Sequence, residues 1–178
     1  MLISQKLKES NIAEYILYMW QVEDSIRALN HDIEQIDRII IRNYDHPSNV
    51  KREIRNWYEQ VIRMMVREDI RDQGHLKLTT DIIRELSSLH QSLLQENSDE
   101  QYKTLMGKAL PFINEFQEKS GANGKGVIET CMNGLYALLL LRLQKKKVNQ
   151  DTKEAMESFR NLISYLSAKY REGNHPRT

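Results

Sequence analysis

A stretch near the N-terminus, NIAEYILYMWQVEDSIRALN at residues 11–30, carries several ionisable side chains in a strongly apolar setting. Carboxylates, a phenol and a guanidinium on one helix can line a polar pocket for a small ligand or an anion, and such a pocket could also be catalytic. A simpler explanation exists as well. Spacings of four residues, as in Glu14–Tyr18 and Glu23–Arg27, allow pairing along one helix face, which a buried charge requires. The candidate pocket residues are Glu14, Tyr18, Glu23, Asp24 and Arg27.

These groups lie in a region with a heptad pattern. Apolar residues alternate spacings of three and four at Ile12, Tyr15, Met19, Val22, Ile26, Leu29, Ile33, Ile36 and Ile40. This spacing predicts one long helix over residues 6–42. Leu17 and Trp20 fall outside the seam, so the first half of this helix has a second apolar face. Either the same chain or another chain covers that face, and in the second case the candidate interface is Leu17, Tyr18 and Trp20.

The rest of the chain repeats helical spacing between short breaks. Only three prolines and seven glycines interrupt it, which favours long helices. Further helices are expected at about 47–72, 78–96, 99–119, 127–146 and from 149 or 151 to 173, with Ser98 capping one of them and Pro111 kinking it. The fold class is therefore all-α. We expect a single-domain bundle of about six helices over residues 1–178, with an apolar, buried fifth helix and a frayed tail at 173–178.

Several chemistries find no support in the residue types and their spacing. The single cysteine, Cys131, rules out an internal disulfide and a cysteine-based zinc cluster, and its apolar surroundings indicate a core residue. No glutamate precedes a histidine by three residues within a predicted helix, so we expect no metal and no cofactor. The glycines around Lys125 lack the spacing of a phosphate-binding loop. No nucleophile motif is present, and we lean against an enzyme.

The charge pattern argues against nucleic acid and against a membrane. The net charge is +1, from 26 basic and 25 acidic residues. Arginines on the predicted second helix are balanced by acids, and the run Lys145–Lys147 ends a helix, where cations are favoured. The longest apolar run, LYALLLL at residues 135–141, is far shorter than the roughly 20 residues of a membrane-spanning helix. With no signal peptide at the N-terminus, we expect a cytoplasmic protein.

The segment NIAEYILYMWQVEDSIRALN, near the start of a chain of this length, resembles an uncharacterised family of small bacterial proteins. The family is known only as a domain of unknown function and is found mainly in the Bacteroidota. The resemblance implies a bacterial, cytoplasmic, helical protein. It provides no reaction, cofactor or ligand, and therefore no catalytic residues to transfer.

Two functions are compatible with these observations. The first is a non-enzymatic helical interaction or scaffold protein that self-associates through its first helix as a homo-oligomer, with a dimer favoured and any other protein partner unknown. The alternative is a protein that binds a small ligand or an anion in a polar pocket around the first helix, and that could be catalytic. Charged residues of the first helix that pair and are closed over favour the first function. Charged residues that converge on a solvent-connected cavity favour the second.

Overall fold

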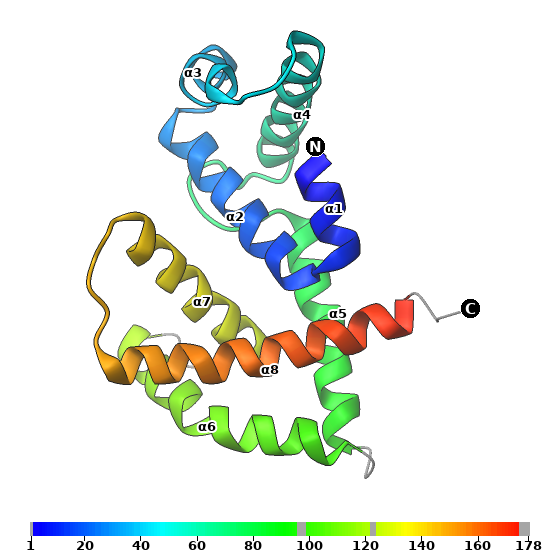
Figure 1. Ribbon diagram of the computed structural model, residues 1–178, viewed down its shortest axis with the longest axis vertical. Helices are drawn as coiled ribbons and strands as arrows, with labels where there is room; N and C mark the ends of the chain where they lie inside the picture. The colour runs from blue at the N-terminus through cyan, green and yellow to red at the C-terminus, as the bar shows by residue number, and fades with distance from the viewer. Residues whose placement is uncertain (1, 96–98, 122–123, 175–178) are drawn as a thin grey trace. The chain divides into compact units, whose positions relative to one another are not determined.

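The structure, a computed structural model, describes residues 2–95, 99–121 and 124–174 (Figure 1). Every regular element in these ranges is helical, which confirms the predicted all-α class. The elements are α1 (Leu2–Ser10), α2 (Ile12–Ala28), α3 (Ile33–Ile39), the 3₁₀ helix η1 (Ile41–Asn43), α4 (Ser48–Arg67), α5 (Lys77–Gln95), α6 (Glu100–Ser120), α7 (Val127–Leu143) and α8 (Gln150–Asn174). The predicted count of about six helices is wrong, because the described ranges contain eight α-helices and one 3₁₀ helix.

The predicted long helix over residues 6–42 is divided into α1, α2, α3 and η1. Its main break follows α2, where Asn30 and His31 adopt left-handed backbone angles with φ of 53° and 60°. The N–H of His31 bonds to the carbonyl of Ile26, and the N–H of Asn30 bonds to that of Arg27, which is the Schellman arrangement of a helix end. Asp32 then caps α3 by accepting hydrogen bonds from the N–H groups of residues 34 and 35. The heptad spacing therefore continues through a turn that ends one helix and begins the next.

Two other helices end in the same way with a non-glycine residue. After α4, Asp69 has φ of 55° and the N–H of Ile70 bonds to the carbonyl of Met65. After α7, Lys145 has φ of 55° and the N–H of Lys146 bonds to the carbonyl of Leu141. Both helices consequently end several residues before their predicted ends at 72 and 146.

The boundaries of the last three helices are closer to expectation. The side chain of Asp99 caps α6 by accepting a hydrogen bond from the N–H of Tyr102, and the predicted cap Ser98 lies outside the described residues. Pro111 lies inside α6, which continues to Ser120. The helix α8 extends past Gly173 to Asn174, and the remainder of the predicted tail lies outside the described residues.

Backbone contacts group the chain into two units, and the expected single domain stays a prediction. The first unit comprises the described residues of Met1–Ser10 and Glu14–Asp81. Within it, α3, η1 and α4 contact one another. Its buried apolar side chains include Ile16, Trp20, Ile26, Ile36, Ile41, Tyr58, Met65 and Leu76. The predicted seam residues of α2 in this unit, Tyr15, Met19, Val22 and Ile26, are buried, and so are Ile16 and Trp20, which lie outside the seam.

The second unit comprises Asn11–Ala13 and the described residues from Ile82 onward. Its helices α6, α7 and α8 contact one another pairwise. The absence of a side chain at Gly134 permits close packing of α7 on α8, since a Cβ there would lie 2.8 Å from the ring of Phe159. The predicted burial of the fifth helix is most complete in the first half of α7, where Ile128, Cys131 and Met132 are fully buried, and it includes Leu138 further along. Its last residue, Leu143, is 57% exposed.

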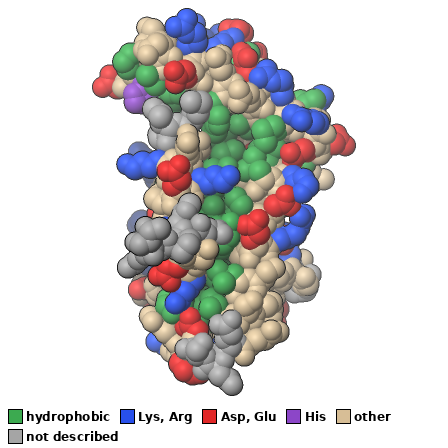
Figure 2. Space-filling model, turned by 90° about the vertical axis from the view of Figure 1, so that its right-hand side faces the viewer, with side chains coloured by type: hydrophobic (Ala, Val, Ile, Leu, Met, Phe, Trp, Pro, Cys, Tyr) green, Lys and Arg blue, Asp and Glu red, His purple; other side chains and the backbone are tan. Residues whose placement is uncertain are grey.

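The surface carries both signs of charge. On the face drawn in Figure 2, acidic and basic side chains are intermixed around hydrophobic ones. Many of the charges pair at a spacing of four residues, as Arg55 and Arg63 do with Glu59 and Lys125 does with Glu129. None of the helices among the described residues combines the length and the apolarity needed to cross a bilayer.

Candidate functional site

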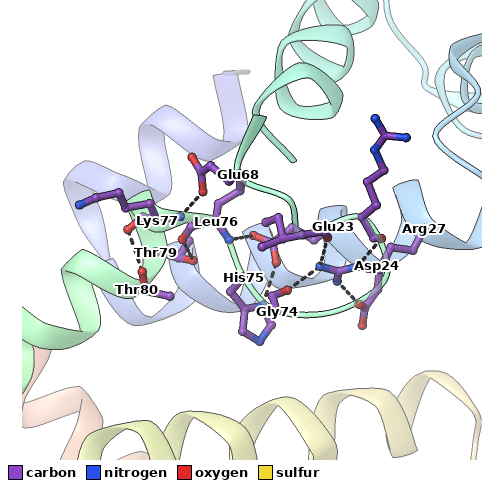
Figure 3. A network of polar contacts seen from close by, with 12 residues as sticks. Glu23, Asp24, Arg27, Glu68, Gly74, His75, Leu76, Lys77, Thr79 and Thr80 are labelled. Carbon is purple, nitrogen blue, oxygen red and sulfur yellow. Dashed lines mark hydrogen bonds and ion pairs between the residues drawn. The ribbon is translucent and has the colours of Figure 1, made fainter. Parts of the chain in front are cut away.

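A network of polar contacts joins α2 to the connection between α4 and α5 (Figure 3). At its centre is Glu23, whose side chain is 0% exposed. One carboxylate oxygen accepts a hydrogen bond from the N–H of Leu76 at 3.1 Å, and the other lies 2.8 Å from Nδ1 of His75. Both oxygens of this buried acid therefore have a partner, as the cost of burying a charge requires.

Arg27 lies one turn further along α2 and holds the same connection by its carbonyl groups. Its guanidinium donates hydrogen bonds to the carbonyl oxygens of Ile70 and Arg71, each at 3.2 Å, and to that of Gly74. It also pairs with Asp24 at 2.9 Å. Glu23 and Arg27, which the sequence suggested as partners of each other, instead bind opposite kinds of backbone group in one segment. An acid accepts from an N–H, and a base donates to carbonyls.

Local sequence explains why this segment can run back along α2. After the left-handed turn at Asp69, Gly74 adopts φ of 89°, a conformation that residues with a side chain rarely adopt. At the start of α5, the carboxylate of Glu68 accepts a hydrogen bond from the N–H of Lys77 at 2.6 Å. The buried hydroxyl of Thr79 donates to the carbonyl of Leu76 at 2.8 Å. The turns at both ends therefore hold in place the segment whose backbone forms hydrogen bonds with Glu23 and Arg27.

Aromatic rings flank the network on α2. The ring of His75 stacks on that of Trp20, with centroids 4.1 Å apart and an interplanar angle of 16°. Trp20 is only 1% exposed, so it is a packed residue of this chain, whereas Leu17 and Tyr18 are partly exposed. Tyr18 stacks on Trp57 of α4 at 6.2 Å. Burial, with a smaller effect of Tyr44, raises the pKa of Tyr18 to about 12, and the phenol stays neutral.

The five candidate pocket residues therefore take different positions. Glu23, Asp24 and Arg27 belong to the network, and Tyr18 belongs to an aromatic pair with Trp57. Glu14 is exposed and precedes Glu23 by nine residues, about 13 Å of helix. The structure brings three of the five together on the α4–α5 connection. A pocket at these residues and an interface at Leu17, Tyr18 and Trp20 both stay predictions.

His75 is the residue that the sequence analysis did not single out. Its side chain is 29% exposed, and a buried carboxylate orients its Nδ1. An imidazole held in this way can exchange protons through Nε2, which is how a general base is presented. The only sequence signal was its position one residue after Gly74, and that signal does not reveal the contact with Glu23.

A second polar cluster lies within the second unit and joins α5, α6 and α8. His90 is 3% exposed, and its Nδ1 lies 2.6 Å from the hydroxyl of Tyr102. Burial lowers the pKa of His90, so the imidazole is neutral at physiological pH. Asp99, which caps α6, also accepts hydrogen bonds from the hydroxyl of Tyr165 at 2.9 and 3.1 Å. The cluster ties three helices together by groups that satisfy one another.

Metal and thiol chemistry have little to build on in the described ranges. No group of three or more His, Cys, Asp or Glu side chains there could hold a metal ion. Cys131 is fully buried, and burial raises the pKa of its thiol to about 12. A thiol in this setting stays protonated and acts as a small apolar side chain.

The fold and the network together define a class: a small all-helical protein whose most buried charged groups bind its own backbone. The chain belongs to the family described as Domain of unknown function (DUF4924), which it matches over residues 1–176. The resemblance seen in the N-terminal segment is thereby confirmed for nearly the whole chain. No curated protein and no solved structure with which the chain was compared matches it.

Proposed function

We propose that this protein is a non-enzymatic helical interaction protein that associates with a second copy of itself. The observation that carries the proposal is the use of Glu23 and Arg27. The carboxylate is fully buried on Leu76 and His75, and the guanidinium is held by three carbonyls and Asp24. Side chains whose polar atoms are already bonded within the chain stabilise the segment that they hold, and they are not available to act on a substrate.

The association surface that we propose lies on α2 and α4 beside this network. Leu17 and Tyr18 are partly exposed, and Trp57, also partly exposed, extends the aromatic area by stacking on Tyr18. Tyrosine and tryptophan are enriched at interfaces because they bury a large area with few rotatable bonds. Trp20 is buried and does not take part in this surface.

Light scattering on the intact protein tests the proposal. We expect a mass of twice the 21.0 kDa protomer for the wild type. The change Leu17→Glu places a charge in the proposed surface and is expected to yield a monomer. The matched control is Leu143→Glu, which changes an exposed leucine of the second unit and is expected to leave the dimer intact.

Either of two results would reject the proposal. A monomeric wild type at concentrations of about 100 μM would rule out a stable dimer, because specific homodimers associate more tightly than this. A folded, dimeric Leu17→Glu variant would remove this surface as the interface. Far-UV circular dichroism establishes that each variant is folded.

A ligand site around α2 is the second candidate, favoured by the Glu23–His75 pair. A partly exposed imidazole oriented by a buried carboxylate could bind an acidic group or transfer a proton. Mass spectrometry of small molecules released on denaturation from the natively purified protein tests this function. Loss of such a molecule from a folded His75→Gln variant would support it, and an empty wild type would reject it. The bacterial origin and cytoplasmic location expected from the sequence belong to the proposal in either case.

A further inference from the structure

A cavity of about 370 Å³ opens in the second unit among α6, α7 and the start of α8, and neither candidate function uses it. Its volume is in the range typical of small-ligand sites. Each helix contributes residues at helical spacing, so three helix faces converge on one space. The apolar lining includes Phe112, Phe116, Ala137, Leu138, Leu141 and Met156.

Packing around the cavity gives it a defined wall. Phe116 meets Phe159 edge to face, with ring centroids 6.1 Å apart. Phe159 in turn fills the position that a side chain at Gly134 would occupy. The helices α7 and α8 approach closely at Gly134. Met156 of the lining lies beside Gly134 and is only 4% exposed. Packed aromatic and aliphatic groups therefore form the wall of a cavity that is open to solvent.

The charged residues of the lining are unequal in number. Glu115, Lys119 and Asp151 are its ionisable members, two acids and one base. Lys119 pairs with Glu115, and this pair is the main reason that the pKa of Lys119 is raised, with Asp151 contributing a smaller attraction. An anionic ligand would therefore meet a lysine that is already paired with Glu115, and it would also meet the carboxylate of Asp151. A cationic ligand would meet a net charge of −1.

We propose that this cavity binds a small organic cation with an apolar body, of the arylalkylamine class. The body would lie against the rings of Phe112 and Phe116, whose faces also attract a cation. The ammonium group would lie at the mouth near Asp151 and Glu115. Lys145–Lys147, in the connection that leads to α8, are not among the lining residues.

The test uses three probes with the same phenylbutyl body: 4-phenylbutylamine, 4-phenylbutanol and 4-phenylbutanoate. Each is titrated into the ¹⁵N-labelled full-length protein at low salt while amide shifts are followed by NMR. We expect the amine to shift the amides of residues 112–120, 134–141 and 149–156, with a dissociation constant below about 1 mM. We expect it to bind about fivefold more tightly than the carboxylate, a preference that decreases at 300 mM salt.

Two variants locate the binding. Ala137 is exposed at the cavity, so Ala137→Phe fills the space without changing a buried position and is expected to weaken amine binding by tenfold or more. The matched control, Ala28→Phe, adds the same ring at the exposed end of α2 and is expected to have no effect. The change Asp151→Asn is expected to reduce the preference for the amine to about twofold. Glu157→Gln, an exposed acid of α8 outside the lining, should leave it unchanged.

Three results would overturn the proposal: no shifts at the lining with any probe, equal or tighter binding of the carboxylate, or unchanged amine binding in folded Ala137→Phe. If that variant fails to fold, the comparison of the three probes on the wild type still decides the charge preference. The outcome is independent of self-association, because the cavity is built from one chain.

Discussion

At the scale of single residues, the buried carboxylate of Glu23 is the most consequential group in the first unit. It has no solvent contact and accepts the hydrogen bond from the N–H of Leu76. Removing one partner of a buried hydrogen bond leaves the other group desolvated and unpaired. The acid is therefore expected to contribute to stability through the backbone that it holds.

Substitution at Glu23 tests this role. We expect Glu23→Ala to lower the free energy of unfolding by about 3 kcal/mol, since the N–H of Leu76 and the ring of His75 both lose a partner. Glu23→Gln keeps a carbonyl oxygen for the N–H and should cost about 1 kcal/mol. Urea denaturation measures both. The exposed Glu53→Ala is the control, with an effect within about 0.5 kcal/mol, and equal stabilities of all three variants would contradict the assigned role.

Burial of the His90 imidazole leads to a prediction about how the stability of the protein depends on pH. Its folded-state pKa is lowered by burial, so between that value and the unfolded value of about 6.5 the unfolded chain binds more protons. The stability from neutral His90 is complete above about pH 6.5 and is lost as the pH falls through the folded-state pKa. The difference in the free energy of unfolding between the wild type and His90→Gln should therefore decrease as the pH is lowered from 7.5 to 5. Parallel curves in thermal unfolding would show that His90 does not titrate as expected.

At the scale of elements, three helix ends determine the path of the first unit and the length of α7. Asn30, Asp69 and Lys145 take left-handed conformations where glycine would be the usual residue. Asparagine and aspartate tolerate this conformation because their short polar side chains bond locally. In NHDIEQ, Asn30 followed by Asp32 and Gln35 carries a stop signal and a capping pair, and the Gln35 amide does reach Asp32, at 3.1 Å. Because the heptad spacing continues across these residues, it indicated an unbroken helix, and the stop signal was overlooked.

The packing of α7 on α8 makes a paired prediction at two glycines. A Cβ at Gly134 would lie 2.8 and 2.9 Å from ring atoms of Phe159, so Gly134→Ala is expected to destabilise the protein by about 2 kcal/mol. Gly107, inside α6, has nothing within 4 Å of the same position, and Gly107→Ala should stabilise by about 0.5–1 kcal/mol through helix propensity. Chemical denaturation gives both values. Stabilisation of similar size in the two variants would show that α7 and α8 do not approach as closely as described.

At the scale of the whole molecule, the balance of charge sets the expected behaviour toward polyanions. The net charge is +1, and two arginines of α4, Arg55 and Arg63, share the carboxylate of Glu59 on the same helix. Counter-ion release from a phosphate backbone requires several cations that act together. The expectation of no nucleic-acid partner rests on this balance.

Retention on a heparin column provides the measurement. We expect the wild type to elute at or below about 150 mM salt, as a protein without a basic patch does. The local run Lys145–Lys147 is the exception to examine, because these side chains are exposed beside Arg142. Elution well above that salt concentration, abolished by changing the three lysines to glutamine, would reveal a polyanion site at the end of α7.

The sequence by itself determined the helical class, the core position of Cys131 and most of the inward faces, because these depend on spacings of three and four residues within a segment. Helix ends were harder to predict from the sequence. A residue other than glycine pays only about 1–2 kcal/mol for the left-handed conformation that ends a helix, so a small difference in free energy decides where the helix stops. The partners of Glu23 and Arg27 could not be derived at all. Apart from Asp24 and the ring of His75, they are backbone groups of residues 70–76, and their identity depends on where the α4–α5 connection returns along α2. The cavity among α6, α7 and α8 likewise exists only once three separate helix faces meet. Local periodicity therefore decides which residues face inward, and tertiary packing decides what each of them meets there.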